Sequence, residues 1–351
     1  MGKFIGFSKI GQFSGVVKDV SKTANWNNEK PGKISFHGTV KSHGTNAGVV
    51  FAPDGSYHIQ SRKNVITVMK DNAGFAAFAE KNIEAFKTFN ETMRQENPYL
   101  EKETLAFFGE WAGKGVQKGV GIANLDKFFV MFGVKVKEVL DENKEVVKDA
   151  CYLHQEVWEN IKNEDSRIFN VNDFKSWDIE IDFMNPKEAS NKMIALVEEV
   201  EKSCPIAEQI HKHDGKELPE DNVGEGIVWV GWDGDTRYVF KTKGAKHSAS
   251  KVKVLVEVDI AKVTSVNEFV ENHVTENRLN QGIEQCFTVE GITDYDRKDT
   301  GKFLKWMAND IVTEEMDSLV KSDLTAKDVN GPISKAARLW FFKHLDEKAG
   351  L

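Results

Sequence analysis

The chain has 351 residues, of which 40% are hydrophobic and 29% are charged, and its formal net charge is −8 at pH 7. This composition is typical of a globular protein, the length suits two domains, and no apolar run approaches the ~20 residues that cross a bilayer, so we expect no membrane partner. The negative charge argues against indiscriminate binding to nucleic acid but is compatible with a local basic groove.

The first ~250 residues mix the periods of strands and helices. Residues 48–51 and 127–132 are apolar runs that predict buried strands, and residues 52–56 have the composition of a turn. Strands over 225–230 and 237–240 flank residues 232–235, which predicts a hairpin.

Helical spacing joins Phe78, Ile83, Phe86 and Phe89 on one face. A further helix is predicted to begin at Asn185-Pro186, with an apolar side of Met193, Ile194, Leu196 and Val197. Residues 142–221 are otherwise acidic and irregular in pattern.

After Val256 the pattern becomes helical. Residues 265–268 form a capping box, in which Ser and Glu satisfy free amides at a helix start. Three helices are predicted, and their apolar residues are Phe269, Val270, His273, Val274 and Leu279, then Phe303, Leu304, Met307, Ile311 and Met316, then Ala336, Ala337, Trp340, Phe341 and Leu345. We therefore expect a domain over 1–255 and a small helical domain over 256–351.

The run Lys41-Ser42-His43-Gly44-Thr45-Asn46 couples a lysine to a glycine turn. A covalent nucleotidyl transferase needs an amine that attacks phosphorus and a tight backbone that lets the nucleotide approach. His37-Gly38-Thr39 repeats the core of this run, but Ser35 stands where the lysine would be. Only the second copy therefore predicts this chemistry.

Four later segments follow the lysine in order: residues 61–63, 108–110, 225–228 and 241–243. Glu110 and Glu225 are candidates for binding ribose hydroxyls and a metal, and Glu225 is the better metal candidate because it lies beside an apolar strand. Lys241 and Lys243 alternate on a predicted strand, so both amines share a face, and a polyphosphate would relieve their repulsion.

The loop Gly113–Gly119 fits neither a P-loop nor a dinucleotide fingerprint, so we interpret it as shaping the site next to Glu110. Lysines gather near two of the motifs, which favours phosphate binding: Lys114, Lys118, Lys241, Lys243, Lys246, Lys251 and Lys253. The 3 cysteines are widely spaced, which argues against structural zinc or a disulfide framework and fits a reducing cytoplasm.

These ordered motifs resemble the bacteriophage RNA ligase 2 family of ATP-dependent RNA ligases, in the covalent nucleotidyl transferase superfamily. The form Lys-x-His-Gly-Thr-Asn at Lys41–Asn46 is particular to that branch. The resemblance extends through Gly109–Gly113, Glu225-Gly226 and Lys241–Lys243 and, less specifically, to Asn277–Asn280 and Lys298–Lys302. It implies an α+β fold, in which ATP-grasp-like antiparallel sheets with helices form the nucleotidyl transferase domain and an all-helical domain follows.

The resemblance implies three transfers. Lys41 would attack the α-phosphorus of ATP and form lysyl-AMP, AMP would pass to an RNA 5′-phosphate, and a 3′-hydroxyl would then displace AMP. Mg²⁺, with Mn²⁺ as a substitute, would be bound by Glu225. Roles toward the nucleotide are implied for Lys41, His43, Gly44, Asn46, Arg62, Glu110, Gln117, Phe129, Lys241 and Lys243.

Among these residues, Glu110 would bind ribose, Arg62 a phosphate or AMP, and Phe129 would stack on adenine. Two positions depart from the family pattern, because Gly133 follows Phe132 where Asp is common and Lys63 replaces a common threonine. RNA contacts are implied for Arg278, Lys298 and Lys302.

We therefore expect an RNA ligase that seals nicks in duplex RNA as a monomer, in the host cytoplasm if it is a phage protein concerned with RNA repair. Two alternatives stay open: a ligase that acts on DNA or mixed DNA/RNA ends, and a non-catalytic RNA-binding protein with a ligase fold.

Overall fold

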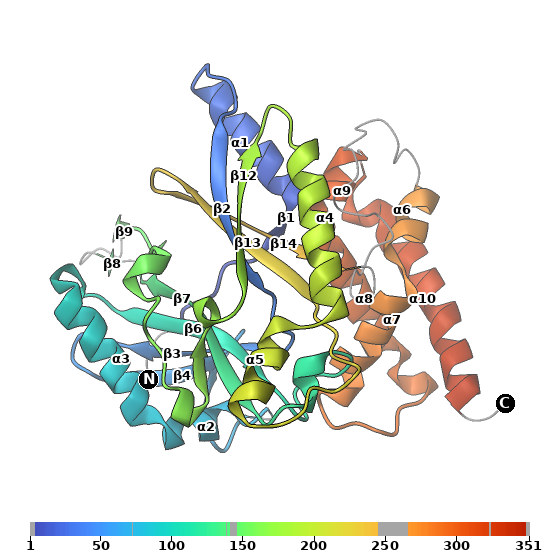
Figure 1. Ribbon diagram of the computed structural model, residues 1–351. Coiled ribbons are helices and arrows are strands. Elements are labelled where there is room, and N and C mark those ends of the chain that lie inside the picture. Colours follow the sequence, from blue (N-terminus) through green and yellow to red (C-terminus); the bar gives the residue numbers. More distant parts are fainter. Residues whose placement is uncertain are drawn as a thin grey trace. The chain divides into compact units, whose positions relative to one another are not determined.

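The computed structural model describes residues 4–71, 73–137, 139–140, 146–244, 266–322 and 324–348 (Figure 1). The chain divides into two compact units. The first comprises Met1–Lys9, His37–Asp178 and Val200–Glu225, and the second comprises Ile10–Phe36, Ile179–Glu199 and Gly226–Leu351. The predicted domain boundary between residues 255 and 256 lies outside the described residues and stays a prediction.

The first unit is built on a sheet with the strand order β10-β7-β6-β3-β4-β5, which is antiparallel along this path, and β11 pairs with β7 in parallel. The predicted strand at 48–51 is confirmed as part of β3, and that at 127–132 is confirmed from Phe128 onward as part of β7. The turn between β3 and β4 is closed by Ala52 N–H, which donates to the Ser56 carbonyl at 2.8 Å. A separate pair is formed by β8 (Val139–Leu140) and β9 (Val146–Lys148). The strands of the larger sheet are β3 (Thr45–Phe51), β4 (Tyr57–Ser61), β5 (Val65–Ile66), β6 (Leu105–Ala112), β7 (Phe128–Val136), β10 (Cys151–Tyr152) and β11 (Ile168–Asn170).

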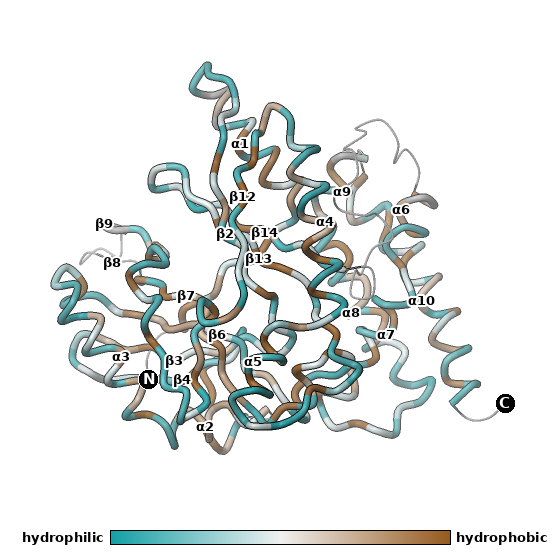
Figure 2. The backbone as a smooth tube through the Cα atoms, viewed as in Figure 1, coloured by the Kyte–Doolittle hydropathy of each residue, from teal (hydrophilic) through white to brown (hydrophobic). Residues whose placement is uncertain are grey.

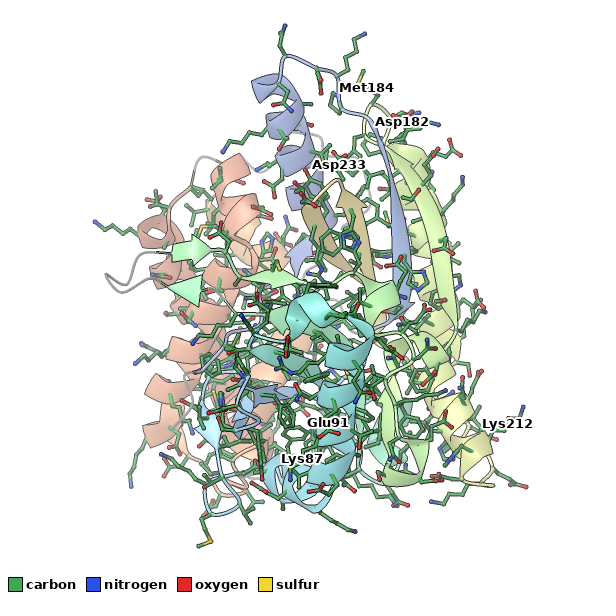
Figure 3. The ribbon with its side chains drawn as sticks, turned by 90° about the vertical axis from the view of Figure 1, so that its left-hand side faces the viewer. Lys87, Glu91, Asp182, Met184, Lys212 and Asp233 are labelled. Carbon is green, nitrogen blue, oxygen red and sulfur yellow. The ribbon has the colours of Figure 1, made fainter. Side chains whose placement is uncertain are left out.

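Helices α2 (Phe75–Lys81) and α3 (Ile83–Glu96) contribute aromatic residues to one face of this sheet. The rings of Phe75 and Trp111 lie 5.7 Å apart, and those of Phe86 and Phe129 lie 5.8 Å apart. The helical face predicted from Phe78 to Phe89 is thus divided between two helices. Figure 3 shows Lys87 and Glu91 on the solvent side of α3.

The other face of the sheet is covered by the N-terminal segment. Ile5 packs with Val50, Ala106 and Phe108 in a buried cluster. Gln60 is fully buried beside it, accepts from Ile5 N–H at 3.1 Å and donates to the Ile5 carbonyl at 2.6 Å. A buried amide whose groups are paired in this way fixes the path of the segment at little net cost. Elsewhere in this unit, α5 (Pro205–His213) follows the buried thiol of Cys204.

The second unit contains a sheet with the strand order β1-β14-β13-β2-β12. The predicted hairpin is confirmed, since β13 and β14 pair antiparallel with Gly226 opposite Lys243. The predicted helix after Pro186 is confirmed as α4 (Lys187–Lys202), and α1 (Phe13–Trp26) packs Phe13 on Phe240 at a ring distance of 5.0 Å. Figure 3 labels Asp182 and Met184 at the end of β12 and Asp233 at the end of β13. The strands are β1 (Gly11–Gln12), β2 (Lys33–Val40), β12 (Ser176–Asp182), β13 (Gly226–Asp233) and β14 (Thr236–Lys243), and the division between the units cuts β2 and β12.

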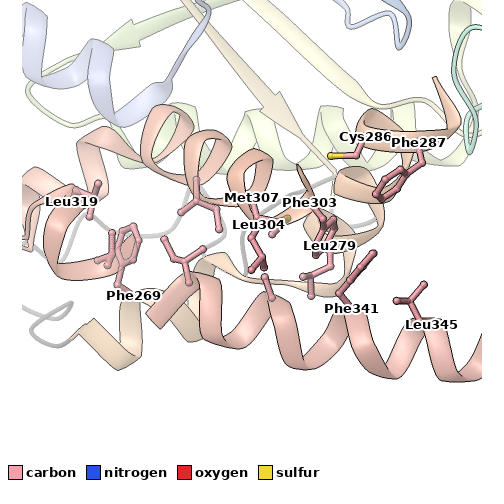
Figure 4. Close-up of a cluster of buried hydrophobic side chains, with 14 residues drawn as sticks. Phe269, Leu279, Cys286, Phe287, Phe303, Leu304, Met307, Leu319, Phe341 and Leu345 are labelled. Carbon is pink, nitrogen blue, oxygen red and sulfur yellow. The ribbon is translucent and has the colours of Figure 1, made fainter. Parts of the chain in front are cut away.

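The C-terminal region of the second unit is helical, as predicted. Along α8 and α10 the tube alternates between hydrophilic and hydrophobic colours (Figure 2), and the apolar sides meet in one core that includes Phe269, Phe303, Met307 and Phe341 (Figure 4). In the described part of the chain, no helix has the length and apolarity needed to span a membrane. The helices are α6 (Val266–His273), α7 (Glu276–Ile283), α8 (Thr300–Glu314), α9 (Met316–Lys321) and α10 (Ala326–Lys348).

Two of the helices predicted in this region are each divided in the structure. The first becomes α6 and α7, because the Thr275 side chain caps α7 by accepting from Arg278 N–H. The second becomes α8 and α9, with Glu315 between them. Ser265 of the predicted capping box lies outside the described residues. We conclude that an α+β chain with antiparallel sheets and a helical C-terminal region is confirmed.

Candidate active site

Lys41 is the first residue after β2, and Glu225 is the last residue before β13. In the first unit, Lys41 Nζ donates to Glu225 Oε2 at 2.6 Å. The lysine side chain is 19% exposed and the glutamate side chain 2% exposed, so the pair is reached from solvent through the lysine. The two motif residues that are 184 positions apart in the sequence therefore form one charged pair.

His43 joins the same carboxylate. Its Nδ1 lies 3.1 Å from Glu225 Oε2, so a single oxygen atom holds both the lysine and the histidine of the motif. A carboxylate held in this way orients Lys41 Nζ and is positioned to accept a proton from it.

Gly44 brings the glycine turn against β6. Its N–H donates to Glu110 Oε1 at 3.0 Å, and its carbonyl accepts from Gln117 Nε2 at 3.4 Å. A Cβ atom at this position would lie 2.2 Å from the Trp111 carbonyl oxygen, so no larger residue fits. This close approach is the reason that position 44 requires glycine. The pairing of β3 with β6 places Asn46 opposite Glu110.

Gly226 satisfies a second close approach, in the second unit. Its φ is +154°, and a Cβ atom would lie 2.1 Å from the Thr242 carbonyl oxygen on β14. Glycine therefore lets β13 begin immediately after Glu225.

Two amide oxygens around the glycine turn are buried with no hydrogen-bond partner among the described residues: Asn46 Oδ1 and Gln117 Oε1. A buried acceptor without a donor costs about 1–3 kcal/mol, which a ligand hydroxyl, a hydrated metal or a metal itself would recover. Carbonyl and carboxylate oxygens are the ligands that Mg²⁺ prefers, so Asn46, Gln117 and Glu225 fit a divalent cation bound with a nucleotide.

Burial raises the pKa of Glu110 above its usual range, and Glu225 adds to the rise, whereas Lys41, the Gly44 amide and His43 oppose it. When the pKa of a carboxyl group is higher in the folded state than in the unfolded state, the folded state binds more protons between these two pKa values. The contribution of the group to stability is therefore lost as pH rises through its folded pKa.

We expect Glu110→Gln to gain stability relative to the wild type as pH rises from about 4.3, because glutamine cannot ionise yet keeps an acceptor for Gly44 N–H. Chemical denaturation of both proteins between pH 4 and pH 8 measures this difference, which should level off above the folded pKa. A difference that does not change with pH would contradict the prediction.

Lys241 and Lys243 lie in the second unit, on β14, and alternate with the buried residues Phe240 and Thr242. Both lysines are therefore on one face of the strand, as the alternation predicts. Lys241 Nζ donates to Glu314 Oε2 at 2.6 Å, which joins β14 to the end of α8.

The carboxylates of α8 were missed by reasoning from the sequence. Burial raises the pKa of Asp310, and Arg278, Lys243 and Lys241 act against this rise. Asp310 and Glu314 are four residues apart on one helix, so they share a face, and this spacing is the sequence pattern from which the two carboxylates could have been predicted. Lys246, Lys251 and Lys253, which were grouped with these lysines, lie outside the described residues.

Arg62 and Lys63 are exposed at the turn between β4 and β5, which is closed by Ser61 N–H donating to the Asn64 carbonyl at 2.8 Å. Arg62 makes no side-chain hydrogen bond or ion pair with another described residue, so the structure does not bring it onto the Lys41–Glu225 pair. Its role toward a phosphate stays a prediction.

Phe129 does not fit its predicted role of stacking on adenine. It pairs with Trp111 across β6 and β7, whereas Glu110 pairs with Val130, so Phe129 and Glu110 point to opposite faces of the sheet. Phe129 is fully buried, with its ring 5.1 Å from that of Phe75. We therefore assign it to the core between the sheet and α2–α3.

Of the residues predicted to contact RNA, Arg278 is 2% exposed and donates to Glu315 Oε1 at 2.7 Å. It is buried in the interior of the helical region, and this placement argues against an RNA contact. Lys298 is exposed, and Lys302 is exposed and lies 2.5 Å from Glu290 Oε2.

The sequence profile of the RNA ligase family matches residues 34–243. This chain belongs to the RNA ligase family. The matched range begins seven residues before Lys41 and ends at Lys243, so it includes all residues predicted to bind the nucleotide, while Arg278, Lys298 and Lys302 lie beyond it.

No curated protein sequence matches this chain. Solved structures of the Naegleria gruberi RNA ligase are similar to it. One structure with AMP and manganese has a TM-score of 0.42 at 17% identity, covering 70% of this chain and 57% of that one. One structure with ATP and manganese has a TM-score of 0.40 at 17% identity, covering 69% of this chain and 57% of that one. The present chain thus spans less than two thirds of the length of that protein.

Proposed function

We propose that this chain is an ATP-dependent RNA ligase that joins a 3′-hydroxyl to a 5′-phosphate through lysyl-AMP and RNA-adenylate. Membership of the RNA ligase family supports the reaction class. The observation that carries the proposal is the 2.6 Å contact between Lys41 Nζ and Glu225, next to a glycine turn that only glycine can make.

In the first step, Lys41 Nζ must lose a proton, because an ammonium group has no lone pair with which to attack. Glu225 Oε2 is positioned to take that proton. A nitrogen–phosphorus bond then forms to the α-phosphorus of ATP as the bond to pyrophosphate breaks. Glu110, which accepts from Gly44 N–H, would bind the ribose, and Lys241 and Lys243 would balance phosphate charge.

A bound Mg²⁺ or Mn²⁺ would supply charge neutralisation on the phosphates. Glu225, Asn46 and Gln117 are the residues we propose to hold it, directly or through water. The subsequent steps transfer AMP to the RNA 5′-phosphate and release it when the 3′-hydroxyl attacks. We place the protein in the phage RNA ligase 2 branch, with nicked duplex RNA as substrate and RNA repair in a host cytoplasm as its setting.

The test is to incubate the purified protein with α-labelled ATP and magnesium and to measure label retained on a denaturing gel. We expect the wild type to be labelled and Lys41→Ala to be unlabelled, because only the Lys41 amine forms the bond. A pyrophosphate wash beforehand removes AMP already bound. An unlabelled wild type would favour the non-catalytic RNA-binding alternative.

Labelled protein is then mixed with a nicked duplex whose 3′-terminal residue carries either ribose or deoxyribose. We expect efficient joining only with ribose at the nick. Equal joining of both substrates would favour the alternative of a ligase for DNA or mixed ends.

A further inference from the structure

The helical region contains a cavity of about 630 Å³, open to solvent, that the reaction proposed above does not use. It lies between the short π-helix Glu284–Thr288, α8 and α10, all in the second unit. Its volume is within the range of about 300–1,000 Å³ that is typical of small-ligand sites.

One face of α8 forms a side of this cavity. Lys302, Lys305, Trp306 and Asn309 follow the spacing i, i+3, i+4 and i+7, which places them along a single stripe of the helix. Gln285 and Asn330 contribute two more amides from the neighbouring elements. The lining therefore combines an aromatic ring, three amides and two lysines.

The polar groups of this lining are not committed to the protein itself. Within the described ranges, the amides of Gln285, Asn309 and Asn330, the Trp306 indole N–H and the Lys305 ammonium make no side-chain hydrogen bond or ion pair. By contrast, Lys302 is paired with Glu290 at 2.5 Å. Lys305, Asn309 and Asn330 are exposed, and Gln285 and Trp306 are partly buried, so all five polar groups can turn to a ligand without breaking a contact within the protein.

Trp306 is held in place on one side and lines the cavity on the other. It is partly buried against the helical core, and a Cβ atom on Gly282 of α7 would lie 3.2 Å from its Cε3. A tryptophan fixed in this way offers a rigid surface for stacking at a small loss of conformational entropy.

The chemistry of the lining selects the ligand. Amide side chains both donate and accept, as the edges of nucleobases do, an indole stacks on a base, and a lysine binds phosphate. With two lysines and one glutamate the lining has a net charge of +1, which suits a single phosphate better than a strongly acidic peptide. Its apolar members, Cys286, Ala308 and Val312 beside Trp306, suit the face of a base, and the charged and amide members argue against a lipid.

We propose that this cavity binds one unpaired nucleotide of an RNA substrate, with the base stacked on Trp306 and its phosphate near Lys305. This inference rests on the proposed function and deepens it, because it assigns to the helical region the recognition of an unpaired nucleotide in a single-stranded tail beside the nicked duplex. Lysyl-AMP formation does not involve the cavity and should be unaffected by changes in it.

The experiment measures fluorescence anisotropy of labelled RNA with 5′-hydroxyl ends, which cannot be ligated. One probe is a blunt duplex and the other is the same duplex with a single-stranded 3′ overhang. We expect Trp306→Ala to weaken binding of the overhang duplex by about 5- to 100-fold, as loss of one base stack does, and to leave the blunt duplex unchanged. Trp306→Phe, which keeps a ring, should restore most of the affinity.

If Trp306→Ala lowers the melting temperature, Lys305→Ala and Asn309→Ala test the proposal in its place, because both change exposed side chains. Each should weaken binding of the overhang duplex, and Lys305→Ala should also reduce the slope of log Kd against log salt by about 0.7. Lys343→Ala is the matched control, since it removes an exposed lysine of α10 that does not line the cavity.

Wild-type affinity for the overhang duplex in both Lys305→Ala and Asn309→Ala would overturn the proposal. So would an equal loss for blunt and overhang duplexes, because the contact would then be to paired RNA. Labelling of Lys41 with ATP is measured in parallel, so a failure of the proposed ligase reaction is distinguished from a failure of this inference.

Discussion

Glu225→Gln is expected to reduce the rate of lysyl-AMP formation by at least about 100-fold, the lower end of the range for losing a positioned acid or base. The side chain is 2% exposed and its Oε2 holds Lys41 Nζ at 2.6 Å and His43 Nδ1 at 3.1 Å. Glutamine keeps the shape but lacks the negative charge that would take the proton and bind a cation. The initial rate of label transfer from α-labelled ATP measures the effect.

Glu164→Gln is the matched control, because Glu164 also pairs with a lysine in the first unit, at 2.8 Å from Lys162, and lies outside the Lys41 group. It should label at the wild-type rate. Circular dichroism establishes that Glu225→Gln is folded. Labelling of a folded Glu225→Gln protein at the rate of the control would show that the carboxylate has no part in the first step.

Arg278→Met is expected to lower the free energy of unfolding of the helical region by about 3–5 kcal/mol, because it leaves buried carboxylates without their cation. Arg278 donates to Glu315 Oε1 at 2.7 Å and its Nε lies 3.5 Å from Asp310 Oδ2. Both arginine and glutamate are almost fully buried. Denaturation in urea, followed by circular dichroism, measures the loss.

Arg297→Met provides the comparison within the same region. Arg297 pairs with Asp346 at 3.0 Å, but its side chain is 64% exposed, so its replacement should change stability by less than about 1 kcal/mol. Adding Glu315→Leu to Arg278→Met should recover much of the lost stability, because a buried pair replaced by apolar residues is often neutral. Equal losses of stability in Arg278→Met and Arg297→Met would show that the buried ion pair contributes no more to stability than the exposed one.

Local patterns in the sequence predicted much of the fold. The β13–β14 hairpin follows from two apolar strands around Asp233-Gly234, since short-range turn chemistry and strand period act over a few neighbouring residues. The requirement for glycine at position 44 was also visible from the motif, although the Trp111 carbonyl that causes it was not.

Side-chain direction on β7 could not be predicted from the same kind of evidence. Phe128 and Phe129 are both apolar and adjacent, and a strand that is buried on both faces has no polar alternation to set its register. A shift in the pairing of β6 and β7 between Phe108 and Gly109 adds a further irregularity. Only pairing with Trp111 assigns Phe129 to the face away from Glu110.

The sequence by itself determined the reaction class expected of this chain, its order of motifs and its local elements, because these depend on residue types that are close together. The tertiary structure decided that Glu225 holds both Lys41 and His43, that Lys241 meets Glu314, and that Arg278 lies in the interior. These contacts join residues 184, 182, 73 and 37 positions apart, so they depend on how whole strands and helices pack, which short-range patterns do not encode.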